Sequence, residues 1–152
     1  MDTPRIIQEI QYAIAPAVMV SSSALLLLGF QNKFSNLANR FRALNQEKRL
    51  LFQKAQREPA EEARLGNLTE QVDQLVKRAS YVKNAILLTY AGILCFVGTS
   101  ILIFLSDTAS SQLYRLTIGV FLLGFVFLLA ASVQMILETN LFYKVISLEK
   151  KV

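Results

Sequence analysis

The feature that most constrains this chain is the uneven placement of its charged residues. They gather between residues 31 and 84 and nearly vanish from three apolar windows, at 12–30, 85–105 and 116–137. A helix needs about 20 apolar residues to cross the hydrocarbon core of a bilayer. With 53% hydrophobic residues divided in this way, the sequence predicts an all-α membrane protein with three transmembrane helices.

The order of segments follows from these windows. Residues 1–30 hold an N-terminal segment and the first transmembrane helix, which we expect to be retained because no clearly basic segment precedes it, as it would in a signal peptide. The charged residues 31–84 form a helical hairpin. The other predicted segments are the second transmembrane helix at 85–105, an external loop at 106–115, the third transmembrane helix at 116–137 and a cytoplasmic tail at 138–152.

Apolar residues in the hairpin recur at alternating intervals of three and four, which indicates a coiled coil. The pattern is interrupted around residues 58–60. A connection this short between two helices can only reverse the direction of the chain. We therefore expect an antiparallel coiled-coil hairpin that extends transmembrane helices 1 and 2. Its predicted seam consists of Phe34, Leu37, Phe41, Leu44, Leu51, Leu68, Val72 and Leu75.

The positive charge of the chain lies in the hairpin. Its net charge is +5, and residues 31–84 hold eleven Lys/Arg against six Asp/Glu. Basic loops stay in the cytoplasm, so we expect the hairpin and the C-terminus inside and the N-terminus outside. Both ends of the hairpin would place basic residues near anionic lipid headgroups. This predicted basic ring consists of Lys33, Arg40, Arg42, Lys77, Arg78 and Lys83.

Several functional classes find no support in the residues. No RNA-binding motif accompanies the basic segment, so we expect no nucleic-acid partner. Histidine is absent and Cys95 is the one cysteine, which excludes a disulfide within the chain and a Cys/His zinc site. No nucleophile elbow or phosphate-binding loop is present. We expect no enzymatic activity, no catalytic residue, no metal and no cofactor.

The first transmembrane helix holds two unusual features. Pro16 removes a backbone hydrogen bond, which predicts a kink or a break. Ser21, Ser22 and Ser23 place three hydroxyl groups near the middle of the bilayer. Serines often bond to carbonyls one turn earlier, and small residues such as Ala17 and Ser21 favour close helix packing. The alternative is that this face lines a polar path.

Glu138 falls at the end of the third apolar window, on one helical face with Gln134. A carboxylate inside a membrane is costly and often functional. Because the helix should leave the lipid at this point, beside Thr139 and Asn140, solvation at the interface is the favoured interpretation.

Three stretches give the chain a resemblance to a known family. They are Ile10-Gln11-Tyr12-Ala13-Ile14-Ala15-Pro16, Asn39-Arg40-Phe41-Arg42-Ala43-Leu44, and the basic start of the second window, Lys77-Arg78-Ala79 with Lys83-Asn84-Ala85-Ile86. In their order and spacing the chain resembles bacterial domain-of-unknown-function family 2721, small three-span membrane proteins. Asn39 stands where the family pattern has aspartate, which removes a charge from any salt bridge to the facing arm. The resemblance implies the topology and leaves the function open.

Two functions fit these patterns. The first is a homo-oligomeric, channel-like assembly, in which copies of the chain enclose a path lined by the serine triplet, with the basic ring at its cytoplasmic mouth. The second is a non-conducting scaffold or assembly subunit of a larger membrane complex, with the hairpin as its docking element. Both place the chain in a lipid bilayer, either the bacterial inner (plasma) membrane or a thylakoid membrane. We favour the channel-like assembly at this point because three hydroxyls exceed what packing requires.

Overall fold

Three long helices form the described part of the chain. The computed structural model describes the backbone of residues 3–53, 59–105 and 111–149, with side chains in 14–53, 59–104 and 113–143. The helices are α1 (Thr3–Phe52), α2 (Pro59–Leu105) and α3 (Ser111–Glu149). At about 1.5 Å per residue, each exceeds the length needed to cross a bilayer.

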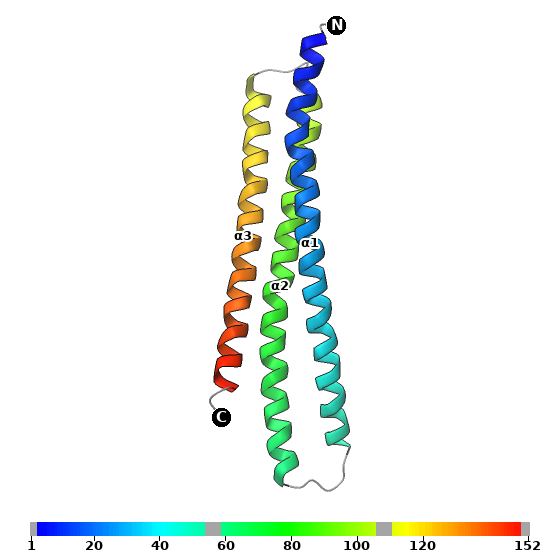
Figure 1. The fold of residues 1–152 in the computed structure, drawn as a ribbon, viewed down its shortest axis with the longest axis vertical. Coiled ribbons are helices and arrows are strands. Elements are labelled where there is room, and N and C mark those ends of the chain that lie inside the picture. Colours follow the sequence, from blue (N-terminus) through cyan, green and yellow to red (C-terminus); the bar gives the residue numbers. More distant parts are fainter. Residues whose placement is uncertain (1–2, 54–58, 106–110, 150–152) are drawn as a thin grey trace.

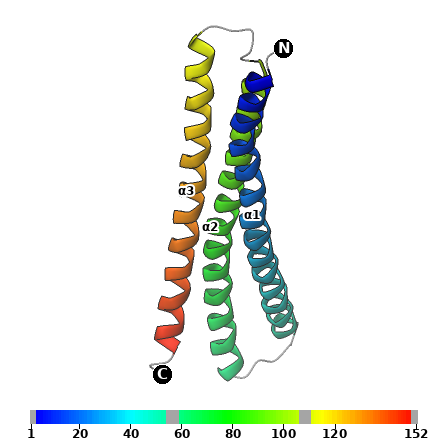
Figure 2. The ribbon, with the colours of Figure 1, turned by 45° about the horizontal axis from the view of Figure 1, so that its top comes forward.

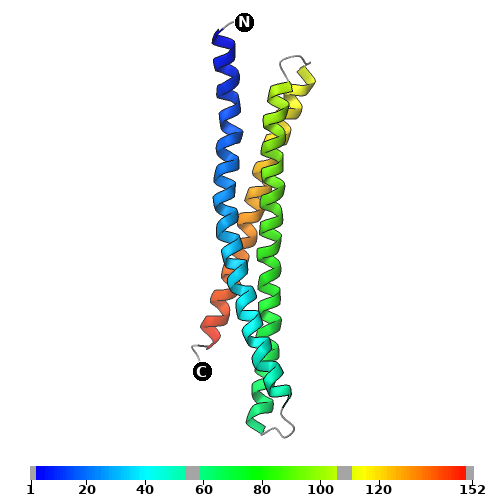
Figure 3. The same cartoon turned by 90° about the vertical axis from the view of Figure 1, so that its right-hand side faces the viewer.

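Helix α2 is the central element, since it packs against both α1 and α3. Figures 1 and 2 show the three helices running along one axis, with α2 antiparallel to each of its neighbours. Helix α3 ends before the α1–α2 hairpin does, so the tip of the hairpin extends past it (Figures 1 and 3). The antiparallel arrangement expected for the hairpin is confirmed.

The helices are long and apolar enough to cross a membrane three times. Each contains an 18-residue window of high mean hydropathy, 1.7 in α1, 2.2 in α2 and 2.5 in α3. Only 11%, 22% and 17% of these windows are buried inside the molecule. Most of the apolar surface therefore faces outward, as expected for side chains that contact lipid or another copy of the chain.

The helix boundaries differ from the predicted segments at several places. Helix α1 runs through Pro16 without interruption, so of the two expected outcomes the break is wrong and the kink stays a prediction; a membrane helix tolerates the single lost hydrogen bond. Helix α2 already begins at Pro59, which fits the preference of proline for the first helical turn, and residue 58 lies outside the described residues. The loop expected at 106–115 is helical from Ser111, and the tail expected from residue 138 continues α3 to Glu149.

The hairpin packs through aliphatic side chains. Leu37, Leu75 and Val82 form a buried cluster, and Leu68 is fully buried nearer the tip. Leu44 packs against this cluster, and Phe41, Leu51 and Val72 are partly buried. Of the eight predicted seam residues, three are thus buried and four are partly buried.

Phe34 is the exception in that seam. Its side chain is 38% exposed, so its assignment to the seam is wrong. The face of α1 that turns inward at this level carries Lys33 and Leu37, which are one turn apart. Phe34 is rotated about 100° away from Lys33 on the helix and therefore points aside.

The apolar parts of α2 and α3 approach each other through glycine and phenylalanine. A Cβ atom on Gly124 would lie 2.7 Å from Cε1 of Phe96, and one on Gly92 would lie 3.2 Å from the carbonyl oxygen of Gly124. Phe96 also makes edge-to-face contacts with Phe121 and Phe125, at centroid distances of 5.6 and 5.7 Å. The two backbones can lie this close only because both glycines lack a side chain.

Candidate functional site

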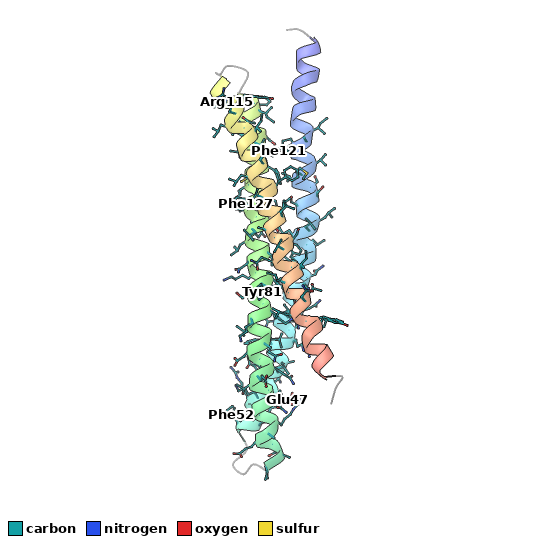
Figure 4. The ribbon with its side chains drawn as sticks, turned by 90° about the vertical axis from the view of Figure 1, so that its left-hand side faces the viewer. Glu47, Phe52, Tyr81, Arg115, Phe121 and Phe127 are labelled. Carbon is teal, nitrogen blue, oxygen red and sulfur yellow. The ribbon has the colours of Figure 1, made fainter. Side chains whose placement is uncertain are left out.

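Each of the three helices has a charged residue that faces the other two helices, at the same end of the apolar segments. Lys33 follows the apolar stretch of α1, Arg78 precedes that of α2, and Glu138 follows that of α3. Because α2 is antiparallel to its neighbours, these positions come to one level of the bundle. Figure 4 shows this level, marked by Tyr81 on α2, where all three helices run together.

The three residues form a connected ionic cluster, which we call the charge triad. The Nε and Nη2 atoms of Arg78 lie 2.9 and 2.8 Å from Oε1 of Glu138. The ammonium group of Lys33 forms an ion pair with Oε2 of the same carboxylate. One carboxylate from α3 therefore connects α1 and α2, with a separate oxygen for each cation.

Neighbouring groups on α3 hold the two cations in place. The guanidinium of Arg78 lies 4.3 Å from the ring centroid of Phe142, one turn after Glu138, in a cation–π arrangement. The Lys33 ammonium donates a further hydrogen bond, at 3.4 Å, to the hydroxyl of Thr139. These contacts orient the cations toward the carboxylate and add to the connection between the helices.

The triad is buried to different depths. The Glu138 side chain is fully buried, that of Arg78 is 13% exposed and that of Lys33 is 34% exposed. The expectation that Glu138 is solvated at the interface is therefore wrong. Helices α1 and α2 continue past the apolar window of α3, and at this level they cover the Glu138 side chain. A carboxylate in such a place needs ionic partners, because an unpaired buried charge is costly.

The predicted basic ring divides into two sets. Lys33 and Arg78 turn inward to Glu138. The other four side chains, those of Arg40, Arg42, Lys77 and Lys83, are exposed. The six residues predicted to form one basic ring near the membrane are therefore not equivalent, because the helical faces that carry Lys33 and Arg78 pack against α3.

The serine triplet occupies more than one face of α1. Ser21, Ser22 and Ser23 donate hydrogen bonds to the carbonyl oxygens of the residues four positions earlier, at 3.2, 2.9 and 2.6 Å. Ser23 is fully buried, whereas Ser21, Ser22 and Ala17 are exposed. Consecutive helical residues differ by about 100° in direction, so the three hydroxyls cannot all face one axis.

The described residues offer no group of three or more His, Cys, Asp or Glu side chains that would hold a metal ion. The triad itself contains one carboxylate whose two oxygens are already taken by cations. The arrangement can hold helices together and can present positive charge, which are roles in structure and in anion binding.

Sequence reasoning found the members of the triad but not their connection. Lys33 and Arg78 stood out as basic residues near the membrane, and Glu138 as an acid at the end of an apolar window. The contributions of Thr139 and Phe142 were missed. One observation would have linked the residues: residues 31–45, 77–90 and 134–143 hold six Lys/Arg and one acid, Glu138, and a lone acid among cations favours pairing.

The fold and the triad together define a class: a three-helix protein able to cross a membrane, with a hairpin that extends beyond its third helix. Residues 13–148 match the family described as Protein of unknown function (DUF2721). The chain belongs to this family, as the sequence resemblance implied. No curated protein and no solved structure matches the chain.

Proposed function

We propose that this protein is a non-conducting membrane scaffold that anchors and orients a helical hairpin for docking. The observation that carries this proposal is the charge triad, which ties all three helices together at the base of the hairpin. Breaking a buried ion pair costs about 3–5 kcal/mol. The hairpin is thereby held in a fixed orientation relative to the membrane anchor, as a docking subunit requires.

The orientation follows from the charges. The exposed basic residues Arg40, Arg42, Lys77 and Lys83 lie at the hairpin end of the apolar segments. By the positive-inside rule this end faces the cytoplasm, in a bacterial inner membrane or a thylakoid membrane, and the N-terminus faces the opposite side. The buried positions Leu37, Leu68 and Leu75 follow the coiled-coil spacing, which supports a two-stranded coiled coil in the hairpin.

The hairpin also offers apolar surface to a partner. Leu50 is 60% exposed and Val76 is 51% exposed, although both lie outside the three apolar windows. Glu47 and Phe52, labelled in Figure 4, mark the end of α1 near the hairpin tip. Exposed apolar residues on a segment in water favour association, either with another copy of this chain or with a subunit of a larger membrane complex.

A homo-oligomeric channel is the second candidate, and one observation favours it. Ser21 and Ser22 are exposed on the apolar part of α1, where they would line a path if several copies formed a ring. Their hydroxyls already donate to carbonyls of their own helix, so each needs no further hydrogen-bond acceptor. Because these hydroxyls already have hydrogen-bond acceptors, we favour the scaffold over the channel.

One experiment separates the two candidates. The full chain is purified in nanodiscs for measurement of its particle mass, and is reconstituted into liposomes for measurement of ion flux. The scaffold predicts no flux above that of empty liposomes. Flux that disappears in the double variant Ser21→Leu and Ser22→Leu, with the particle mass unchanged, would establish the channel instead. Ser35→Leu makes the same change at an exposed serine of α1 outside the apolar window and serves as the matched control for flux.

The docking role is tested on two adjacent hairpin residues. Val76→Asp changes an exposed side chain, and Leu75→Asp changes a buried one. We expect Val76→Asp to reduce association while it preserves helix content and thermal stability. Leu75→Asp should lower thermal stability as well as association. If association and particle mass remain unchanged in Val76→Asp, this face of the hairpin is not a docking surface.

A further inference from the structure

The charge triad is not electrically neutral. Two cations share one carboxylate, so the cluster carries a net positive charge if all three groups are ionised. The more exposed cation is Lys33, with about a third of its side chain accessible (34%). An ammonium has three donor hydrogens and a guanidinium has five. The contacts with Glu138 use only part of this capacity.

The surroundings of the triad add positive charge and no negative charge. Within residues 31–45, 77–90 and 134–143, Glu138 is the one acid. Four exposed basic side chains lie on the hairpin side of the apolar segments, those of Arg40, Arg42, Lys77 and Lys83. The acid that balances part of this charge is fully buried, so the accessible surface at this level is basic.

Apolar and aromatic side chains border the same level. Ile136 and Leu137, just before Glu138, are 58% and 44% exposed. Tyr143, just after it, is 74% exposed. Tyrosine favours the boundary between hydrocarbon and headgroups, where its ring is in lipid and its hydroxyl in water. A ligand at this level would meet cations at one end and an apolar helix surface at the other.

We propose that the charge triad is a binding site for the phosphate of an anionic glycerophospholipid, with Lys33 as its principal contact. Basic sites between transmembrane helices on the cytoplasmic side bind anionic headgroups. A phosphate oxygen supplies the missing negative charge, and the acyl chains of the lipid cover the exposed apolar surface of α3. Free phosphate would satisfy the cations only, so the apolar border favours a lipid. The site is independent of what the hairpin binds.

Native mass spectrometry of the full chain from nanodiscs that contain phosphatidylglycerol and phosphatidylcholine tests this site. We expect preferential retention of phosphatidylglycerol by the unaltered chain. Lys33→Gln leaves the neutral Arg78–Glu138 pair and should lower this preference about tenfold, since it removes a charge-assisted hydrogen bond. Lys83→Gln removes an equal charge from an exposed position and should lower it about twofold or less. Equal losses in the two variants would overturn the proposal in favour of diffuse attraction.

Two further arms make the test independent of folding in Lys33→Gln. Glu138→Gln leaves two cations without their carboxylate, so its melting temperature should rise more with phosphatidylglycerol than that of the unaltered chain. An equal rise in both proteins would overturn the proposal. Inorganic phosphate is the other probe: in phosphatidylcholine nanodiscs it should not bind at millimolar concentration. Its binding there, with loss in Lys33→Gln, would show that the site takes a free anion and not a lipid.

Discussion

The two halves of α2 pack by different means. In the hairpin, α2 contributes Leu75 and Val82 to a cluster with Leu37 of α1. In the apolar half, it contributes Gly92 and Phe96 to a close contact with Gly124 of α3. Large aliphatic side chains fill the first interface, whereas small residues with an aromatic cluster form the second.

The difference follows from the surroundings expected for each half of α2: water for the charged half and lipid for the uncharged half. In water, burial of leucine stabilises a helix pair at about 25 cal/mol per Å² of apolar surface. In lipid the surroundings are as apolar as leucine, so helices associate through close van der Waals fit. The charge triad lies where one kind of packing gives way to the other, and it connects α1, α2 and α3. Changes to the charge triad, the hairpin cluster and the glycine contact should therefore have different effects on stability.

Loss of the triad carboxylate should have the largest effect. Glu138→Leu leaves two cations without their partner and should lower the free energy of unfolding by about 3–5 kcal/mol. The measurement is reversible unfolding in mixed micelles with increasing SDS. The control is the triple variant Lys33→Met, Arg78→Met and Glu138→Leu, which should recover most of the loss because no unpaired charge remains. If the single variant were as stable as the unaltered chain, the triad would have no structural role.

The hairpin cluster should be nearly as sensitive. Leu75→Ala removes a side chain that is 5% exposed and should cost about 2–5 kcal/mol through lost burial and a cavity. The adjacent Val76 is 51% exposed, so Val76→Ala should change stability by about 0.5 kcal/mol or less. Similar losses in the two variants, measured by thermal unfolding followed by circular dichroism, would contradict the assigned packing face.

The glycine contact in the apolar half should lose stability when a side chain is added, whereas the hairpin cluster loses stability when one is removed. The expected loss is also smaller. The Cβ of Gly124→Ala would meet the Phe96 ring and should cost about 1–3 kcal/mol. A Cβ atom on Gly119 would meet no atom within 4 Å, so Gly119→Ala should be neutral or slightly stabilising. SDS-dependent unfolding of both variants compares them, and equal stability would show that α2 and α3 are not in close contact there.

The ion pair near the hairpin tip should matter least. Nη2 of Arg64 lies 2.9 Å from Oε1 of Glu47, but the two side chains are 50% and 41% exposed. Exposed pairs contribute about 0–1 kcal/mol, so Arg64→Ala should lower the melting temperature only slightly, and less still at high salt. A loss as large as that in Glu138→Leu would mean that the tip is buried against another copy.

Much of the architecture could be predicted from the sequence. Separated apolar windows indicate spanning helices whatever their neighbours are, and the three-and-four spacing placed Leu37, Leu68 and Leu75 correctly on the buried face. The seam assignment was wrong for Phe34 because the spacing takes account of two helices only. The adjacent Lys33 pairs with α3, so the face of α1 that carries Phe34 points away from the bundle. The helical start at Ser111 was missed because polar residues are common both in loops and in first helical turns.

The candidate site was harder to predict, for a physical reason. Lys33, Arg78 and Glu138 lie on three different helices and far apart along the chain, so local pattern does not show which of them meet. Position at the end of an apolar window suggested solvation for Glu138. Burial came instead from α1 and α2, which continue past that window. The contact of Arg78 with Phe142 depends on helix rotation, which hydropathy does not determine.

The central claim is that Glu138 connects α1 and α2 through its ion pairs, and a double-mutant cycle tests it most directly. The free energy of unfolding is measured for the unaltered chain, Arg78→Met, Glu138→Leu and the double variant. We predict strong coupling: the double variant should be more stable than the sum of the two single losses by about 1–3 kcal/mol. Additive losses, within about 0.3–0.5 kcal/mol, would contradict the ionic connection between the helices.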